Sequence, residues 1–228
     1  ASVTLTLADA LNSTGNMNVN SGSTTKIVTA NFSVTCDHIL GASGVFDFGS
    51  STITLTSATT PINNTGFTIT TGTSTLKTTD ASGATLTIAG NGATYYNLWL
   101  SGAGSENYTI TGANTFHDIR CNEGTTAHTI TFPNSTTTVT TFTGTSGKLV
   151  TLQRTGGAGA WTLSSAADLS CDYVNISNCT KSGGGKLYCG THSTDGGGNN
   201  ADVIFTDPPS AAIFIPAAHM IGGRAISV

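Results

Sequence analysis

The sequence predicts an all-β fold, a single-stranded right-handed parallel β-helix in which short strands stack as a solenoid. The first observation behind this prediction is an internal repeat. Residues 95–100 and 116–121 align aromatic on aromatic and Asn97 on Asp118 at one constant offset. Segments 36–40 and 171–176 share part of the pattern. A strand-sized unit that recurs at such a spacing is typical of solenoids, because one repeat cannot bury its apolar face alone.

The second observation is the composition. Charged residues make up 9% of the 228 residues, whereas ordinary globular chains carry about 25%. Disordered segments are usually rich in charge and poor in β-branched residues. Here Thr, Val and Ile favour strands, and Gly, Asn and Ser favour the turns between them. The composition therefore indicates one all-β domain or one elongated module, whose solubility comes from hydroxyl and amide groups.

The third observation is the pattern of turns. A meander of hairpins favours two-residue Asn-Gly turns between strands of equal length, and Asn91-Gly92 is the one clean example in the chain. About three strands per repeat favour a parallel β-helix instead, with a β-sandwich or jelly roll as the alternative. If each turn takes about 20 to 30 residues and strands stack ~4.8 Å apart, roughly eight turns give a rod on the order of 40 Å long.

Residues 1–30 are expected to form an N-terminal strand or cap region. Apolar side chains alternate with Thr over residues 3–7, and a segment punctuated by Gly and Asn leads to a second apolar run at residues 26–28. This region would supply a first repeat of the solenoid or a lid over it.

Residues 31–206 are predicted to form the β-helix repeats, with apolar side chains facing inward and Thr facing outward. The expected strands are, in order, residues 32–34, 39–40, 45–48, 53–55, 67–69, 86–88, 95–100, 108–110, 116–121, 130–132, 139–142, 149–152, 161–163, 173–176, 187–189 and 203–205. The period lengthens after residue 139. Glycine runs at residues 156–157, 183–185 and 196–198 are expected to be insertions in loops on one face of the stack.

The repeat pattern ends at Asp207-Pro208-Pro209, because consecutive prolines donate no ladder hydrogen bonds. Residues 207–228 are far more apolar than an ordinary tail and must be covered. They are expected either to cap the last turn of their own chain or to dock on a neighbouring subunit. The second alternative is favoured, and its docking residues would be Ile213, Phe214, Ile215, Met220, Ile221 and Ile226.

The charge balance argues against several classes of partner. A formal net charge of −4 and a pI near 5.6 leave no basic stripe to neutralise phosphates, so no nucleic-acid partner is expected. No apolar run approaches the ~18 residues of a membrane span, and the chain as given shows no signal peptide. No cofactor and no metal is expected.

The five cysteines, Cys36, Cys121, Cys171, Cys179 and Cys189, are predicted to be small buried side chains with free thiols. If the protein is exported, the last three are close enough in sequence for one disulfide, although spacing does not decide which two would pair.

A position that the repeats share is the first candidate for chemistry. It holds Asp37, Asn97, Asp118 and Asp172. Carboxylates that stack on one face of a β-helix could assemble an acid, a base and a metal site for polysaccharide cleavage. The alternative is a turn in which Asp and Asn bind the local backbone. The turn is favoured, because one member is Asn and the members do not fall in consecutive repeats, and no catalytic pair is nominated.

Other candidates carry weaker signals. The histidines His38, His117, His128, His192 and His219 have no metal-ligand spacing. Residues 193–200 are similar to a calcium-binding turn but lack its further carboxylates. Surface aromatics that could stack on sugars are Trp99, Tyr96, Tyr173 and Tyr188, although Trp99 and Trp161 are more often core residues.

Part of the chain resembles a known group of proteins. The segments FTGTSGKLVTL at residues 142–152, WTL at 161–163, CDYVNIS at 171–177 and NNADVIF at 199–205 are similar to the Thr/Ser/Gly-rich β-helix repeats of bacteriophage virion proteins. The similarity covers about residues 93–206 and carries no catalytic residues. Related repeats occur in bacterial surface adhesins.

This resemblance implies a non-enzymatic virion component, such as a tail fibre, a tip or a capsid decoration subunit, made in the host cytoplasm. Its expected partners are further copies of itself and other virion subunits, and a host surface glycan is a further candidate. The alternatives are a carbohydrate-binding adhesin, extracellular or on a cell surface, and a β-helix polysaccharide lyase or hydrolase.

Overall fold

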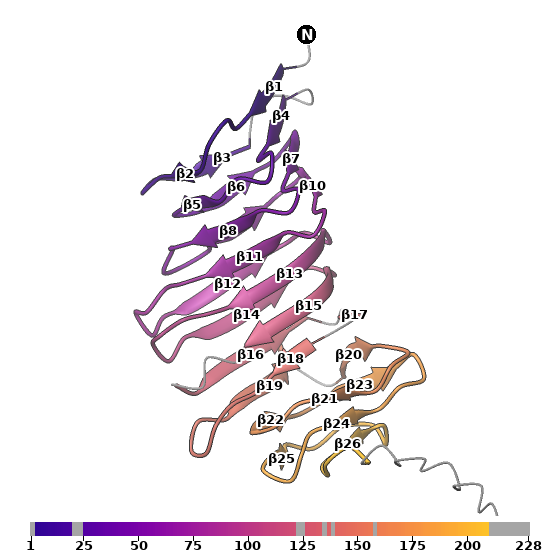
Figure 1. Ribbon diagram of the computed structural model, residues 1–228. Helices are drawn as coiled ribbons and strands as arrows, with labels where there is room; N and C mark the ends of the chain where they lie inside the picture. The colour runs from indigo at the N-terminus through magenta and orange to yellow at the C-terminus, as the bar shows by residue number, and fades with distance from the viewer. Residues whose placement is uncertain are drawn as a thin grey trace, which may run out of the picture.

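The predicted solenoid is confirmed. The computed structural model describes residues 3–19, 25–121, 126–133, 136–137, 140–156 and 159–209, and within these ranges every regular element is a β-strand. The strands pair side by side in parallel, turn upon turn, and form an elongated stack (Figure 1). No hairpin sandwich is present in this part of the chain, because the paired strands run parallel and their partners lie one turn away.

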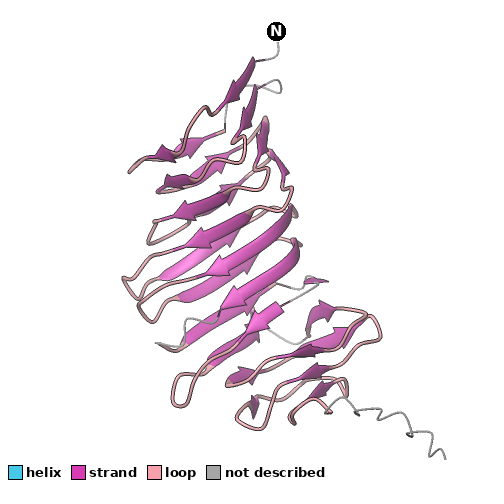
Figure 2. Cartoon of the chain, viewed as in Figure 1, coloured by secondary structure: helices cyan, strands magenta, loops and turns pink. Residues whose placement is uncertain are grey.

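The strands form five parallel sheets, which we group into faces A, B and C in the order in which a turn of the chain reaches them (Figure 2). The turns that contain β13 and β15 have no separate face-A strand. Face A contains β1 (Val3–Thr6), β4 (Thr25–Val28), β7 (Val45–Asp47) and β10 (Thr68–Thr70), and later β17 (Thr136–Thr137), β20 (Trp161–Ser164) and β23 (Cys179–Ser182).

Face B is one sheet for most of its length and continues past a bridge between Thr143 and Asp172. Its strands are β2 (Leu11–Asn12), β5 (Val34–Cys36), β8 (Thr52–Leu55), β11 (Thr75–Thr78), β13 (Thr94–Leu100), β15 (Thr115–Cys121), β18 (Thr140–Phe142), β21 (Leu169–Ser170), β24 (Leu187–Tyr188) and β26 (Val203–Ile204).

Face C is a 9-stranded sheet, which agrees with the expected number of turns. Its strands are β3 (Met17–Asn18), β6 (Ile39–Gly41), β9 (Ile62–Asn64), β12 (Thr85–Ala89), β14 (Asn107–Thr111), β16 (His128–Phe132), β19 (Val150–Arg154), β22 (Val174–Ile176) and β25 (Thr194–Asp195). The strands of the first turn, β1, β2 and β3, pair with β4, β5 and β6 of the second turn. The N-terminal region therefore supplies a first repeat.

The core is a set of columns, because parallel pairing places equivalent residues of successive turns above one another. On face B such a column consists of fully buried aliphatic side chains, namely Val34, Ile53, Leu76, Leu98 and Ile119. On face C the column Ile39, Ile62, Ile88 and Ile110 does the same. Within each strand these inward residues alternate with outward residues such as Thr, which explains the two-residue period of apolar residues in the sequence.

Polar groups at the corners are paired within the chain. The buried Asn64 side chain donates a hydrogen bond to the Phe67 carbonyl at 3.0 Å and accepts one from the Gly66 amide at 2.9 Å. Two turns on, Asn114 donates to the Thr111 carbonyl at 2.9 Å. Because a buried backbone group costs stability when it has no partner, these asparagines stabilise the bends between faces.

The predicted lengthening after residue 139 is correct for one turn only. Thr143 bridges Asp172 across that long turn, and a hairpin closed by Thr145 and Lys148 lies within it. The next turns are shorter, since Leu187 pairs with Val203, a partner much nearer in the sequence.

The glycine runs 183–185 and 196–198 are therefore not insertions, and that prediction is wrong. Gly183, Gly184, Gly197 and Gly198 have φ between 73° and 96°, a region that glycine adopts without steric cost. They turn the chain in few residues and so shorten the repeat. Phe32, expected to begin a strand, lies before β5 and is 37% exposed.

The residues predicted to dock on a neighbouring subunit, from Ile213 to Ile226, lie outside the described residues, as does most of the C-terminal segment that is predicted to cap or dock. Within the described chain the last strand is β26, and the Thr206 carbonyl still accepts a hydrogen bond from the Gly190 amide at 3.2 Å.

Replacing one residue of a core column tests the packing. Leu76→Ala is expected to lower the free energy of unfolding by about 2 to 5 kcal/mol, because it leaves a cavity between the turns before and after it. The matched control is Thr54→Ala, an outward residue on the neighbouring strand, which should change stability by less than about 0.5 kcal/mol. Urea unfolding followed by circular dichroism measures both, and equal effects of the two substitutions would contradict the inward column.

Candidate functional site

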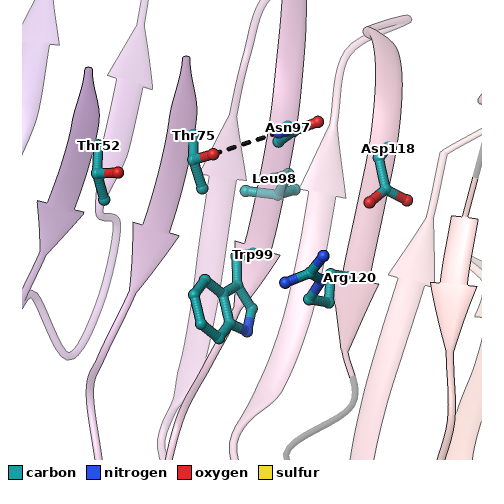
Figure 3. A pocket seen from close by; sticks show the side chains of 7 residues that line it. All are labelled: Thr52, Thr75, Asn97, Leu98, Trp99, Asp118 and Arg120. Atoms are coloured by element: carbon teal, nitrogen blue, oxygen red, sulfur yellow. Dashed lines mark hydrogen bonds between the residues drawn. The ribbon is translucent and has the colours of Figure 1, made fainter. Parts of the chain in front are cut away.

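A small cleft lies on the outer surface of face B (Figure 3). Its volume is about 140 Å³, and residues from four neighbouring strands line it: Thr52 of β8, Thr75 of β11, Asn97, Leu98 and Trp99 of β13, and Asp118 and Arg120 of β15. Ligand sites in proteins are usually larger, roughly 300 to 1,000 Å³, so this cleft suits one small ring or the end of a longer molecule.

Two outward rows of side chains build the cleft, and the strand register sets both. The first row is Thr52, Thr75, Asn97 and Asp118, all of which line the cleft. The second row is Thr54, Lys77, Trp99 and Arg120, of which Trp99 and Arg120 line it. Each row runs along the axis of the stack, with neighbours about one strand spacing apart.

Trp99 is the centre of the second row. The Lys77 ammonium lies 3.9 Å from the centroid of its ring, and the Arg120 guanidinium lies 5.3 Å from it. Each cation is attracted by the π-electrons of the indole, an interaction worth roughly 0.5 to 1 kcal/mol at an exposed site. Figure 3 shows the guanidinium turned towards the indole. Trp99, for which the sequence favours a core position, is therefore a half-buried surface residue.

Asp118 supplies the carboxylate of the cleft. Its Oδ1 is buried and has no hydrogen-bond partner among the described residues. Burial raises the pKa of this carboxyl group, while the nearby charges of Arg120 and His117 lower it, and burial prevails. Beside it, the Asn97 amide donates to the Thr75 hydroxyl at 3.3 Å. Figure 3 shows the amide oxygen of Asn97 on the side that faces Asp118.

The predicted stack of Asp37, Asn97, Asp118 and Asp172 is only half correct. Asn97 and Asp118 pair directly in β13 and β15, within a regular sheet and not in a turn. Asp37 and Asp172 lie beyond the ends of face-B strands, at a different place in the turn. Asp172 accepts a hydrogen bond from the Tyr173 amide at 2.9 Å, so for this residue the local turn is the correct interpretation.

The histidines have separate surroundings. The Nε2 atom of His38 lies 2.9 Å from the Asp37 carboxylate, and the Nδ1 atom of His192 lies 3.0 Å from that of Asp172. His117 stacks on Tyr96 with ring centroids 4.2 Å apart, and His128 is buried with Nδ1 3.3 Å from the Glu106 carbonyl oxygen. His219 lies outside the described residues.

The remaining sugar-stacking candidates differ in exposure. Tyr96 and Tyr173 are half-buried, and His192 stacks on Tyr173 with ring centroids 4.5 Å apart. Tyr188 is 8% exposed and Trp161 is fully buried, so Tyr188 is wrong as a surface candidate. The Trp161 indole donates to the Ser177 carbonyl at 3.0 Å.

The loop at residues 193–200 uses its polar groups internally. Asp195 accepts hydrogen bonds from the Gly197 amide at 2.8 Å and from the Asn199 side chain at 2.7 Å. Asn199 in turn accepts one from the Cys179 amide at 2.9 Å. In the described part of the chain, no group of three or more His, Cys, Asp or Glu side chains is placed to hold a metal ion.

All five cysteines are buried free thiols, as predicted. Cys171 and Cys189 follow directly on the paired strands β21 and β24, and the neighbouring thiol together with burial raises the pKa of Cys171. Thiols held in the protonated form are poor nucleophiles, which agrees with their prediction as core side chains.

Comparison of the chain with protein-family models, with curated proteins and with solved structures finds no match. The described residues contain no helix long and apolar enough to cross a membrane.

Lys77 and Arg120 were missed by the sequence reasoning. The alignment of residues 95–100 with 116–121 already sets Arg120 against Trp99, but it compares aromatic and amide or carboxylate positions and not charge. Lys77 stands on a third strand, one turn before Trp99, so only an alignment of three successive turns places it beside the tryptophan.

Replacing Asp118 tests its surroundings without a ligand. Burial raises the pKa of Asp118 above its ordinary value of 3.8. Between pH 3.8 and the raised pKa, the folded protein therefore binds more protons than the unfolded chain. The stability it contributes therefore falls as pH rises through that window. Asp118→Asn is expected to be at least as stable as the parent at pH 7, with the difference vanishing at pH values below the ordinary pKa. Thermal unfolding across pH measures this, and a variant less stable at pH 7 would show that the carboxylate is well solvated or paired.

Proposed function

We propose that this chain is a non-enzymatic structural component of a bacteriophage virion, such as a tail fibre, a tip or a capsid decoration subunit. The observation that carries the proposal is the parallel ladder from β1 to β26, which stacks three faces around one apolar core. Such a ladder satisfies its backbone hydrogen bonds between turns, so the module is a rigid rod. The similarity of residues 142–205 to virion β-helix repeats supports the same function.

The partners proposed for this rod are other copies of the chain and other virion subunits, after synthesis in the host cytoplasm. The apolar C-terminal segment is the proposed contact, since an exposed run of such residues is stable only when covered. The acidic balance of the chain supports a partner other than nucleic acid.

A second candidate function is binding of a surface glycan, as in an adhesin on a cell surface or in the extracellular space. The cleft on face B favours it, because an aromatic ring, an amide, a carboxylate and a guanidinium converge there. Glycoside hydrolysis usually takes two carboxyl groups on either side of the bond, and the residues that line this cleft include one, Asp118. The cleft therefore supports binding more than it supports hydrolysis.

Localisation is tested with an antibody raised against the purified chain. Immunogold electron microscopy of particles from cultures that produce the chain is expected to label virion tails or capsid surfaces. Label confined to cell surfaces would support the adhesin instead and refute the virion component.

Assembly is tested by substitution of the docking segment within the full chain. The parent is expected to sediment as a homo-oligomer, and replacement of Ile213, Phe214 and Ile215 by Ser should shift it to the monomer, because the apolar contact is lost. Thr54→Ser, on the outer surface of β8, is the matched control and should leave the oligomer intact. A parent that is monomeric at all concentrations, or a triple variant with unchanged sedimentation, would contradict docking by this segment.

A further inference from the structure

We propose that the cleft on face B binds a carboxylate-bearing sugar, as one unit of an acidic polysaccharide. In this arrangement Arg120 and Lys77 attract the sugar carboxylate, and Asp118 and Asn97 bind its ring hydroxyls. The inference rests on the proposed contact with a surface glycan and specifies the chemistry of that glycan.

The first step is the pair of cations. Lys77 is half-buried and Arg120 is exposed, one on each side of Trp99. Among the described residues neither has a carboxylate within ion-pair distance, whereas Lys26 pairs with Asp47 at 2.9 Å. The two cations flank Trp99 on a chain of net charge −4. Against the single nearby carboxylate of Asp118, on which the Arg120 charge acts, they leave a local excess of positive charge that attracts an anionic ligand.

The second step is the tryptophan, which distinguishes acidic from neutral sugars. A neutral sugar that stacks on indole needs one open face of the ring. Here the two cations lie against the ring of Trp99 from the strands on either side of β13. The tryptophan holds the two charges in place and does not offer an open platform, so charge and hydrogen bonds select the ligand.

The third step is the unpartnered carboxylate oxygen. Asp118 Oδ1 is buried in the lining of the cleft and has no hydrogen-bond donor among the described residues, and an unmade hydrogen bond at a buried acceptor costs stability. Oδ1 is closed to solvent in this structure, so a sugar hydroxyl donates to the carboxylate after a rotation of the Asp118 side chain. Asn97 stands next to it in the same row, with its amide held by the Thr75 hydroxyl. The cleft thus offers acceptors for hydroxyls beside cations for a carboxylate.

The test compares pairs of sugars in which one member carries a carboxylate and the other, otherwise as similar as possible, is neutral. Trigalacturonate is compared with its methyl ester, which keeps the rings and removes the charge, and sialyllactose is compared with lactose. Binding to the full chain is measured by isothermal titration calorimetry at low and at high salt. At least one acidic probe is expected to bind at least tenfold more tightly than its neutral counterpart, and to weaken as salt is added.

The variants assign the binding to the cleft. Arg120→Gln and Lys77→Gln are each expected to weaken the acidic probe at least fivefold, while circular dichroism and thermal unfolding show an intact fold. Lys186→Gln removes the same charge from an exposed residue outside the cleft and should bind like the parent. Equal weakening by Lys186→Gln would indicate non-specific attraction and overturn the site.

The remaining outcomes also decide the matter. Binding of neither acidic probe, or equal binding of acidic and neutral probes, overturns the proposal and leaves the sedimentation and immunogold results for the virion component untouched. Shortening of polygalacturonate that is lost in Asp118→Asn would support the ligand class and refute the non-enzymatic function.

Discussion

The parallel hydrogen-bond ladder between successive turns is the constraint on which the rest of this molecule depends. Because each strand pairs in register with the strand one turn before it, a residue type that recurs at the period of the repeat becomes a column in space. Inside, such columns are aliphatic, as in Val34, Ile53 and Leu76. Outside, they are rows of Thr interrupted at one place by Asn97, Asp118, Trp99 and the two cations.

Much of this arrangement could be predicted from the sequence. The offset between the strands at residues 95–100 and 116–121 is the register of β13 and β15, because side chains of a repeat that stack must match in size and polarity. The alternation of Thr with aliphatic residues predicted which side chains face inward. Both the repeat offset and the alternation are visible in the local sequence.

The rest could not be predicted, for two physical reasons. A short motif does not show whether it lies within a face or at a corner, so Asp37 and Asp172 were aligned with Asn97 although they follow the ends of strands. Glycine with positive φ can either lengthen a loop or tighten a turn, and only the register shows that Gly183 and Gly184 tighten it. The cleft escaped notice because its residues come from four strands on four successive turns.

Low charge is what makes the cationic pair on face B informative. A rod made soluble by hydroxyl and amide groups needs few ions, so two cations gathered around one indole stand out from the Thr rows beside them. The same ladder that gives rigidity also holds Lys77, Trp99 and Arg120 in place without a separate binding domain, so assembly and recognition could share one module.

The register of face B is measured most directly by nuclear Overhauser effects between backbone protons in the full chain. Parallel stacking requires contacts of Trp99 with both Lys77 and Arg120, and of Asn97 with both Thr75 and Asp118, in one consistent direction along the strands. Contacts that run in the opposite direction along neighbouring strands, as in a β-sandwich of hairpins, would contradict the solenoid and with it the cleft.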